Sequence, residues 1–264
     1  MTVLRTIYIV WWRDVIRFWR DRVRLLASLA QPLLYLVIFG SGLSSALGGG
    51  LSGAGGVSYT QFIYPGVISM TILFSSIFGA MSIVWDREFG FMKELLVAPI
   101  ARSSVAIGKT LGSTTQSLVP AVILLVLAPF VGVTFTVASF LQLLALMVVL
   151  AFGLSAFGVA IASRMKSMQG FQVVMNFLMM PMFFLSGALF PLVGLPLWMT
   201  VLTRVDPASY GIDPIRRTVL GRAAERTAMT IGDRIVPIGI EALVVLVFGS
   251  VMLAIAARSF QHRD

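Results

Sequence analysis

The residue types that usually carry chemistry are scarce in this chain. Its 264 residues include no cysteine and a single histidine, His262. Disulfides, thiolate metal sites and cysteine nucleophiles are therefore excluded, and a histidine metal cluster or a Ser-His-Asp triad is implausible. The stretch Gly108-Lys109-Thr110 ends like a phosphate-binding loop, but Ser103 stands where that motif requires a glycine. The sequence thus predicts no catalytic residue, no metal or cofactor, and no ATP site in this chain.

Composition excludes an ordinary soluble protein. Hydrophobic residues make up 58% of the chain, charged residues make up only 12%, and the mean hydropathy is +0.95. A soluble domain carries about 25% charged residues, and a disordered chain needs low hydrophobicity. The net charge of +9 is interpreted as a membrane-topology signal, and no nucleic-acid partner is expected.

Long uncharged runs separate the charged segments, and each run is long enough to cross a membrane. The runs are 25–85, 110–163, 167–203 and, with Glu241 as the only exception, 235–257. A spanning helix needs about 20 apolar residues. Breaks at 40–56 and 129–136 divide each of the first two runs into two helices, and the third run gives one helix over 168–190. We predict an all-α integral membrane protein with six transmembrane helices in a single permease domain, residues 1–264.

Basic residues predict the orientation of the chain. Fourteen of the 20 Lys and Arg residues lie in segments on one side of the six-helix arrangement: 1–24, 85–109, 164–166 and 258–264. Because Lys and Arg accumulate in cytoplasmic loops, both termini are predicted to be cytoplasmic, in a cell membrane. The other six are arginines in the long outer segment 191–234, where this rule acts weakly. Residues 1–24 carry arginines throughout, so no cleaved signal peptide is expected.

Residues 4–24 predict an amphipathic helix in the membrane interface. At 100° per residue, a tryptophan-rich arc lies opposite a charged arc. The two arcs contain, respectively, Trp11, Trp12, Val15, Ile16, Phe18, Trp19, Val23 and Arg13, Asp14, Arg17, Arg20, Asp21, Arg24. Trp and Arg both favour headgroup depth, so Trp11, Trp12 and Trp19 are the expected contacts with membrane lipids. The helix is either a simple anchor for the first span or an elbow that also contacts a cytosolic partner.

A short charged segment, residues 85–99, connects the second and third predicted spans on the cytoplasmic side. It is amphipathic, it begins with Trp85-Asp86-Arg87-Glu88, and Pro99 ends it. Taken alone, such a segment is typical of a solvated loop with a helical turn.

With its surroundings, however, the segment resembles the permease subunits of type-2 ATP-binding-cassette exporters, in particular the daunorubicin-resistance-like group. In that family a Pro-Gly near the start of the second span precedes a DRExG…E.L…P loop and a Gly-Lys at the third span. The matching positions are Pro65-Gly66, Asp86-Arg87-Glu88-Phe89-Gly90, Glu94, Leu95, Pro99 and Gly108-Lys109. The stretch from Asp206 through Tyr210 to Arg216-Arg217 is similar to the family's outer P…Y…LR element. The resemblance covers nearly the whole chain.

The resemblance implies a dimeric permease, either a homodimer or a pair with a paralogue, that binds two ATPase subunits. ATP and Mg²⁺ would be held by those partners and not by this chain. The loop at 85–99 would be the coupling helix that sits in a cleft of the ATPase. Its implied contact residues are Asp86, Arg87, Glu88, Gly90, Lys93 and Glu94. A short charged helix that joins two spans can convert rotation of a partner into helix tilt.

Two further sets of residues take their implied roles from the family. The first and fifth spans would line the dimer interface and the substrate route, which selects Tyr35, Phe39, Asn176, Phe177 and Met180. Lipid-facing or packing roles are the alternative for each of them. The segment 191–234 would form short re-entrant helices that act as an outer gate, held by Asp206, Tyr210, Asp213, Arg216 and Arg217. Contact of this segment with lipid headgroups is the competing interpretation.

Ionisable residues are absent from the first five predicted spans. Ion-driven carriers usually need such groups in the membrane, so their absence favours energy supplied by a partner. Glu241, near the outer end of the last span, is placed to reach the interface or to pair with an arginine such as Arg234. The function predicted from the sequence is therefore an ATP-driven exporter of hydrophobic drug-like or lipid-like molecules, of bacterial or archaeal type. A secondary carrier, a channel and a non-transporting membrane scaffold are the alternatives.

Overall fold

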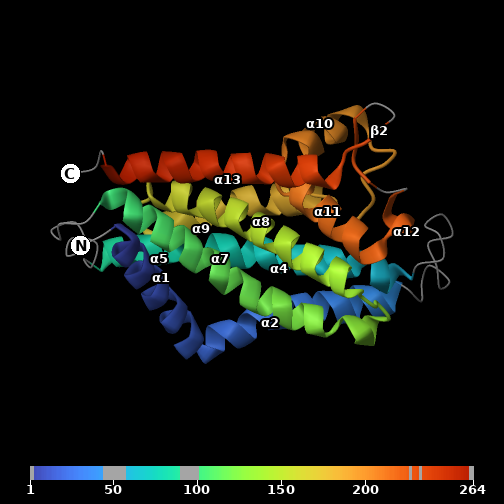
Figure 1. Ribbon diagram of the computed structural model, residues 1–264, viewed down its shortest axis with the longest axis horizontal. Coiled ribbons are helices and arrows are strands. Elements are labelled where there is room, and N and C mark those ends of the chain that lie inside the picture. Colours follow the sequence, from blue (N-terminus) through green and yellow to red (C-terminus); the bar gives the residue numbers. More distant parts are fainter. Residues whose placement is uncertain (1–2, 44–57, 90–100, 226–227, 232–233, 262–264) are drawn as a thin grey trace.

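The computed structural model describes residues 3–43, 58–89, 101–225, 228–231 and 234–261. Long helices dominate these residues and run side by side, while α1 and α2 meet at an angle along one edge (Figure 1). The helices of the bundle are α1 (Val3–Arg20), α2 (Arg22–Val37), α4 (Tyr59–Gly79) with its short continuation α5 (Met81–Glu88), α7 (Arg102–Val126), α8 (Val137–Ala162), α9 (Met168–Leu185) and α13 (Ile238–Gln261).

The remaining elements lie between these helices in the chain. They are the π-helix η1 (Ile38–Leu43), the 3₁₀ turn η2 (Ala128–Val131), α10 (Leu197–Val205), α11 (Ser209–Leu220), α12 (Arg222–Glu225), β1 (Thr230–Ile231) and β2 (Arg234–Ile235). The two strands pair antiparallel, with Thr230 opposite Ile235. The predicted all-α class is confirmed, since this two-residue hairpin is the only sheet among the described residues.

Five helical stretches in the described part of the chain are long and apolar enough to cross a membrane. They are Arg22–Gly40, Tyr59–Glu88, Val137–Ala162, Met168–Leu185 and Ile238–Phe260. The predicted third span corresponds to α7, which has the length but not the composition. Its buried face carries Lys109 and a series of hydroxyl residues, which α1, α4 and α8 cover. A helix that turns polar groups toward protein does not show the apolar composition of a lipid-exposed span.

Local sequence signals set several helix starts. Ser58 and Gln61 form a capping box at α4, in which each side chain bonds the other's backbone N–H. Thr136 and Ser139 do the same at α8, and Ser167 accepts from the Gly170 N–H at α9. Caps of this kind satisfy backbone donors that have no partner within the helix.

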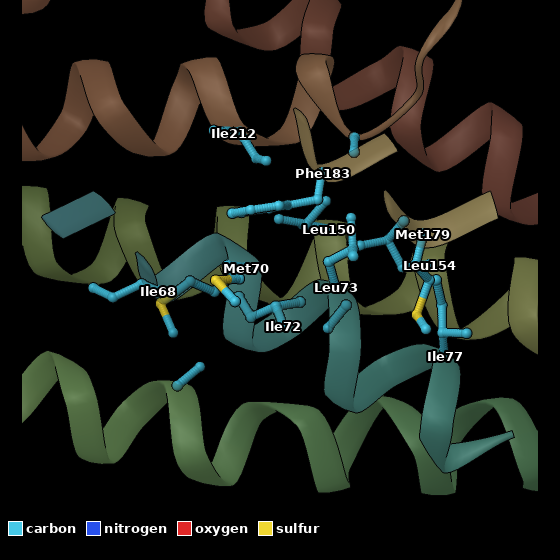
Figure 2. Packing of buried hydrophobic residues seen from close by; sticks show 14 of the residues in the cluster. Ile68, Met70, Ile72, Leu73, Ile77, Leu150, Leu154, Met179, Phe183 and Ile212 are labelled. Carbon is cyan, nitrogen blue, oxygen red and sulfur yellow. The ribbon is translucent and has the colours of Figure 1, made fainter. Parts of the chain in front are cut away.

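Helix α4 lies at the centre of the core. It is apolar around its whole circumference, as expected for a helix covered on all sides, and α2, α7, α8, α9 and α11 pack against it. Figure 2 shows side chains from several elements meeting along α4. The residues labelled there are Ile68, Met70, Ile72, Leu73 and Ile77 of α4, Leu150 and Leu154 of α8, Met179 and Phe183 of α9, and Ile212 of α11.

The Pro65-Gly66 pair lies where α4 approaches the turn after α9 most closely. A Cβ atom added to Gly66 would lie 2.1 Å from the carbonyl oxygen of Ala188. Small residues let membrane helices and turns approach at backbone distance. A side chain at position 66 therefore requires the turn at 187–188 to move.

We expect Gly66→Ala to destabilise the protein by about 1–3 kcal/mol or more, as overpacking of a rigid core does. Gly239→Ala is the matched control, because a Cβ there meets nothing within 4 Å. Thermal unfolding in detergent should show a lowered midpoint for Gly66→Ala and an equal or higher one for Gly239→Ala. Equal midpoints for both variants would contradict the close approach.

Candidate functional site

Lys109 is the centre of a buried ion cluster that joins three helices. Its ammonium group, on α7, is fully buried and lies 2.7 Å from Oδ2 of Asp86 on α5. The same nitrogen lies 3.1 Å from the carboxylate of Asp14 on α1 and donates to Oγ of Ser82 at 3.2 Å. A buried charge is tolerated only when paired and hydrogen-bonded. Both carboxylates are therefore needed at these positions to compensate the buried charge of Lys109.

Two arginines of α1 complete this cluster at its partly exposed edge. Arg13 donates to Oδ2 of Asp86 at 2.7 Å, and a guanidinium nitrogen of Arg17 lies 3.6 Å from Oδ1. Arg17 also lies over the ring of Trp85, 5.4 Å from its centre. Three cationic side chains thus surround two carboxylates, Asp14 and Asp86.

Close packing and two polar contacts hold α1 on α7. A Cβ at Gly108 would lie 2.8 Å from Cβ of Val10, and one at Gly112 would lie 3.1 Å from Cβ of Asp14. The indole N–H of Trp11 donates to Thr115 at 3.0 Å, and Gln116 donates to the carbonyl of Asp14 at 3.1 Å. The Gly108-Lys109 pair therefore fixes α1 on α7: the glycine allows close approach of the two helices, and the lysine provides the buried charge that pairs with Asp14.

The structure modifies the expected orientation of α1. Trp12 and Trp19 are 46% and 65% exposed, as residues available to lipid must be, but Trp11 bonds to α7. The stripe that faces protein is Thr6, Val10, Asp14 and Phe18. Asp14 had been expected on the charged outer arc. The sequence pattern distinguished two faces of this helix, whereas packing against α7 uses a third that lies between them.

The described start of the segment 85–99 is tied to other parts of the chain. Arg87 donates to the carbonyls of Ser163, at 2.9 Å, and Met165, while Glu88 accepts from the backbone N–H of Met168 at 3.0 Å. The end of α5 is thereby fixed to the α8–α9 turn. Gly90, Lys93 and Glu94 lie outside the described residues.

This arrangement changes the role expected for Asp86. Its side chain is 5% exposed, so the carboxylate faces Lys109 and not a partner protein. The pairing was not foreseen because Lys109 stands 23 residues further along the chain, and only helix packing brings the two together.

The expected pathway residues lie away from this cluster. Tyr35 and Phe39 are partly buried and stack one helical turn apart, with ring centres 5.4 Å apart. Asn176, Phe177 and Met180 lie on the outer surface of α9, where Phe177 is 78% exposed. Tyr35 of α2 and Phe39 of η1 pack in part against the core, whereas Asn176, Phe177 and Met180 lie on a surface of α9 that the described part of the chain leaves exposed.

The expected outer-gate residues form a second buried cluster. Arg217 of α11 lies 3.0 Å from Oδ2 of Asp213 and pairs with Glu241 of α13, and it donates to the carbonyl of Val236 at 2.7 Å. Glu241 thus has an arginine partner from the outer segment, but this is Arg217 and not Arg234. Asp213 and Arg217 are one helical turn apart, and the packing of α11 on α13 brings Glu241 to them.

Two further bonds attach this cluster to the turn after α9. Arg216 is buried, donates to the carbonyls of Gly187 and, at 2.9 Å, Ala188, and lies 4.4 Å from the ring centre of Phe62. Tyr210 donates to the carbonyl of Arg204 at 2.9 Å. The segment 197–220 is therefore joined to α4, α9 and α13 by polar contacts.

Asp206 is buried at the junction between α10 and α11. Its Oδ1 accepts from the N–H of Ala208 at 2.9 Å, and its Oδ2 has no hydrogen-bond partner among the described residues. Burial raises the pKa of Asp206 to about 7, because loss of water from the charged form outweighs the hydrogen bonds that Ala208 and Ser209 provide.

We expect Lys109→Met to destabilise the protein by about 3–5 kcal/mol, since two buried carboxylates then lose their shared cation. The double variant Lys109→Met, Asp14→Asn should recover part of that loss, because it also removes one of the two charges. Thermal unfolding in detergent measures both. Lys166→Met, at an exposed lysine, is the control and should leave the midpoint unchanged; a similar fall there would refute the special role of Lys109.

We expect Asp206 to make the protein less stable as pH rises. Its pKa is about 7 in the folded protein and near the ordinary value of 3.8 for an aspartate in the unfolded chain. The stabilising contribution of its proton is therefore complete below pH 4 and is lost as pH rises through 7. Asp206→Asn should reduce the fall in unfolding midpoint between pH 5 and pH 8. Asp21→Asn, at an exposed aspartate, should keep the parent's fall, and an unchanged fall in Asp206→Asn would disprove the assignment.

Comparison with known proteins agrees with this architecture. The family model for the ABC-2 type transporter matches residues 5–220. The chain is 28% identical over 219 residues to "Putative transport permease ycf38" of Cyanophora paradoxa, covering 81% of this chain and 73% of the relative. It is 25% identical over 225 residues to nodulation protein J of Rhizobium leguminosarum bv. viciae, covering 84% and 85% of the two chains.

A third relative is the inner membrane transport permease YadH of Escherichia coli K12, which is 28% identical over 214 residues, or 80% of this chain and 82% of the relative. Members of this family are transmembrane subunits and not themselves ATPases. With its apolar helices and a family match over most of its length, the chain is a multi-pass membrane protein that belongs to the ABC-2 type transporter family as a permease subunit.

Proposed function

We propose that this chain is the membrane subunit of an ATP-driven exporter, with ATP and Mg²⁺ bound by two ATPase subunits that are separate chains. The observation that carries the proposal is the way the end of α5 is anchored. Asp86 ties it to α1 and α7, and Arg87 and Glu88 tie it to the α8–α9 turn. The coupling segment 85–99 begins at this junction, in a chain of the ABC-2 family.

Such an anchor supports transmission of movement. A force applied to the coupling segment would reach α1 and α7 through buried ion pairs, which cannot stretch without exposing charge, and α8 and α9 through hydrogen bonds at their turn. Closure of the ATPases on bound ATP would push the two coupling segments together, tilt these helices and open the route outward. The contacts expected of Lys93 and Glu94 with the ATPase are part of this proposal.

The proposed topology has six spans with both termini in the cytoplasm, and α7 is the third. At about 1.5 Å per residue its 25 residues extend roughly 37 Å, more than the hydrocarbon thickness of about 30 Å. Its polar face is turned to protein, so its composition is compatible with crossing. Helices α10 and α11 would be the re-entrant outer gate, with Asp213, Arg216 and Arg217 holding it in place.

A dimer, formed with a second copy or a paralogue, is proposed for the uncovered surfaces of α2 and α9. The exposed apolar residues on these surfaces are Leu26, Leu34 and Val37 of α2, Ile38 of the adjoining η1, and Val173, Phe177, Met180 and Phe184 of α9. Asn176, an exposed amide on the same surface, would bond across the dimer, because an amide in hydrocarbon needs a partner. The substrate, a hydrophobic drug-like or lipid-like molecule, would move outward along this interface.

An ion-driven carrier is not favoured by the buried carboxylates of α1, α5 and α13, which are paired with cations, and Asp206, which is buried without a paired cation among the described residues, lies outside these helices, between α10 and α11. Glu241 is paired with Arg217, and Asp14 and Asp86 share Lys109. Carboxylates bound to permanent cations are poor proton carriers, whereas they suit mechanical attachment.

Co-purification tests the proposal directly. The C-terminally tagged chain, extracted gently from its native membrane, should recover a cassette ATPase. Glu94→Lys should abolish this recovery, because it reverses a charge in the coupling segment. Glu225→Lys, which reverses an acidic charge in the proposed outer segment, should recover the ATPase as the parent does. Absence of an ATPase from the parent sample, under conditions that keep related complexes intact, would overturn the exporter and favour the scaffold.

A further inference from the structure

A cavity of about 450 Å³ lies beside the junction of α1 and α2, which we call the elbow (residues 20–22). Its walls come from α1, α2, α4 and α5, with Gln116 of α7 and Gln172 of α9. This volume is within the range that holds drug-sized ligands. The pathway residues expected from the family are not among those that line it.

The cavity is long and has one apolar wall. On α4 and α5 its lining residues follow one helical stripe: Met70, Thr71, Phe74, Ser75, Phe78, Met81, Ser82 and Trp85. From Met70 to Trp85 this stripe extends about 22 Å at 1.5 Å per residue. Across it, Phe18, Ala27 and Pro32 provide apolar contacts from α1 and α2. The shape suits one extended chain.

Charge gathers at the elbow end of this stripe. Arg24 donates to the carbonyl of Phe78 at 3.3 Å, its only hydrogen bond through the side chain among the described residues, and Arg17 lies over Trp85. The nearby acids already have partners. Asp21 accepts from the N–H of Arg24 as the cap of α2, and Asp14 and Asp86 bind Lys109.

The ion cluster and the cavity lining together carry one excess positive charge, whereas the four charged residues of the lining alone (Arg17, Arg24, Asp14 and Asp21) balance. Four cations (Arg13, Arg17, Arg24 and Lys109) stand against three carboxylates (Asp14, Asp21 and Asp86), so 4 − 3 = +1. Arg17 and Arg24 are the two cations that line the cavity. A ligand with one anionic group beside them would neutralise this excess.

One buried acceptor in the wall also requires a donor. Gln116 is 4% exposed and lines the cavity, and its Oε1 has no hydrogen-bond partner among the described residues. Its amide nitrogen is already committed to the carbonyl of Asp14. A ligand hydroxyl near the anionic group would satisfy this oxygen, since buried polar atoms are rarely left unpaired.

We propose that this cavity binds a single-chain amphiphile whose anionic head, with a hydroxyl beside it, lies against Arg17 and Arg24 while its chain lies along the α4–α5 stripe. Binding is a property of this chain alone. We further infer that the bound amphiphile is the exported substrate, which would define the substrate class. This step rests on the proposed function.

Quenching of tryptophan fluorescence tests the site, because Trp85 lines it. The purified chain, in nanodiscs of phosphatidylcholine and without ATPase, is titrated with lysophosphatidic acid brominated along its acyl chain. We expect saturable quenching that Trp85→Phe reduces. Arg24→Gln should weaken the apparent affinity about tenfold, the size expected for a lost hydrogen bond to a charged group. Arg22→Gln, two residues away and outside the lining, should bind as the parent does.

A second variant keeps the test valid if Arg24→Gln folds poorly. Ser75→Phe fills the chain end of the cavity, leaves every charge in place, and should also weaken binding. Equal affinity in the Arg22 and Arg24 variants, or no saturable quenching in the parent, would overturn the proposal.

Competing ligands separate the sources of the signal. Monooleoylglycerol has the chain and hydroxyls without the charge, and glycerol 3-phosphate has the head without the chain. Each should compete at least tenfold more weakly than unlabelled lysophosphatidic acid. If monooleoylglycerol competes equally, the site is purely apolar. If glycerol 3-phosphate competes equally, the site binds free phosphate. Either result refutes binding of an anionic amphiphile. Binding that persists while no ATPase co-purifies would refute the exporter and leave this site standing.

Discussion

The buried charge of Lys109 constrains much of this structure. An ammonium group with no solvent contact requires carboxylates within hydrogen-bond distance, and the chain provides them from α1 and α5. Once these are in place, α1 must lie against α7, and the start of the segment 85–99 must lie beside both. The glycines at 108 and 112 make room for this arrangement, because any larger residue would separate the helices. Packing and electrostatics therefore agree on one position for α1.

A second ion cluster, at the other end of the bundle, likewise joins helices through buried charges. Arg217, Asp213 and Glu241 join α11 to α13, and Arg216 fixes the turn after α9 against Phe62 of α4. Between the clusters α4 packs mainly through apolar side chains, with single hydrogen bonds such as those of Tyr64 and Ser76. Polar attachment at both ends with an apolar middle lets helices tilt as units, because dispersion contacts tolerate small sliding better than buried ion pairs do. This division of roles suits a permease that must change shape while its ends stay connected.

The cavity at the elbow follows from the same cluster. Lys109 holds Asp14 and Asp86, Arg17 also lies beside Asp86, and Asp21 caps α2, so the cluster and the lining together contain one more cation than carboxylates. Helix α1 ends at Arg20 and α2 begins at Arg22, and a space with one charged end lies between this junction and the α4–α5 stripe. The buried site of Lys109 and the cavity proposed to bind an anionic amphiphile thus both follow from one arrangement of helices.

The sequence alone determined the class of the protein, since low charge, long apolar runs and the spacing of Lys and Arg depend only on local composition. The charged segment after Trp85 was also evident from the sequence, the family resemblance implied short helices in 191–234, where α10 and α11 lie, and the family match confirms the permease subunit. The partners of individual charges were decided by tertiary structure. Asp14 and Lys109 are 95 residues apart, and Arg217 and Glu241 are 24 apart, so no local periodicity relates them. Helical phase predicts which residues share a face, but which face meets which neighbour depends on glycine contacts and buried charge, and these exist only once the helices have packed.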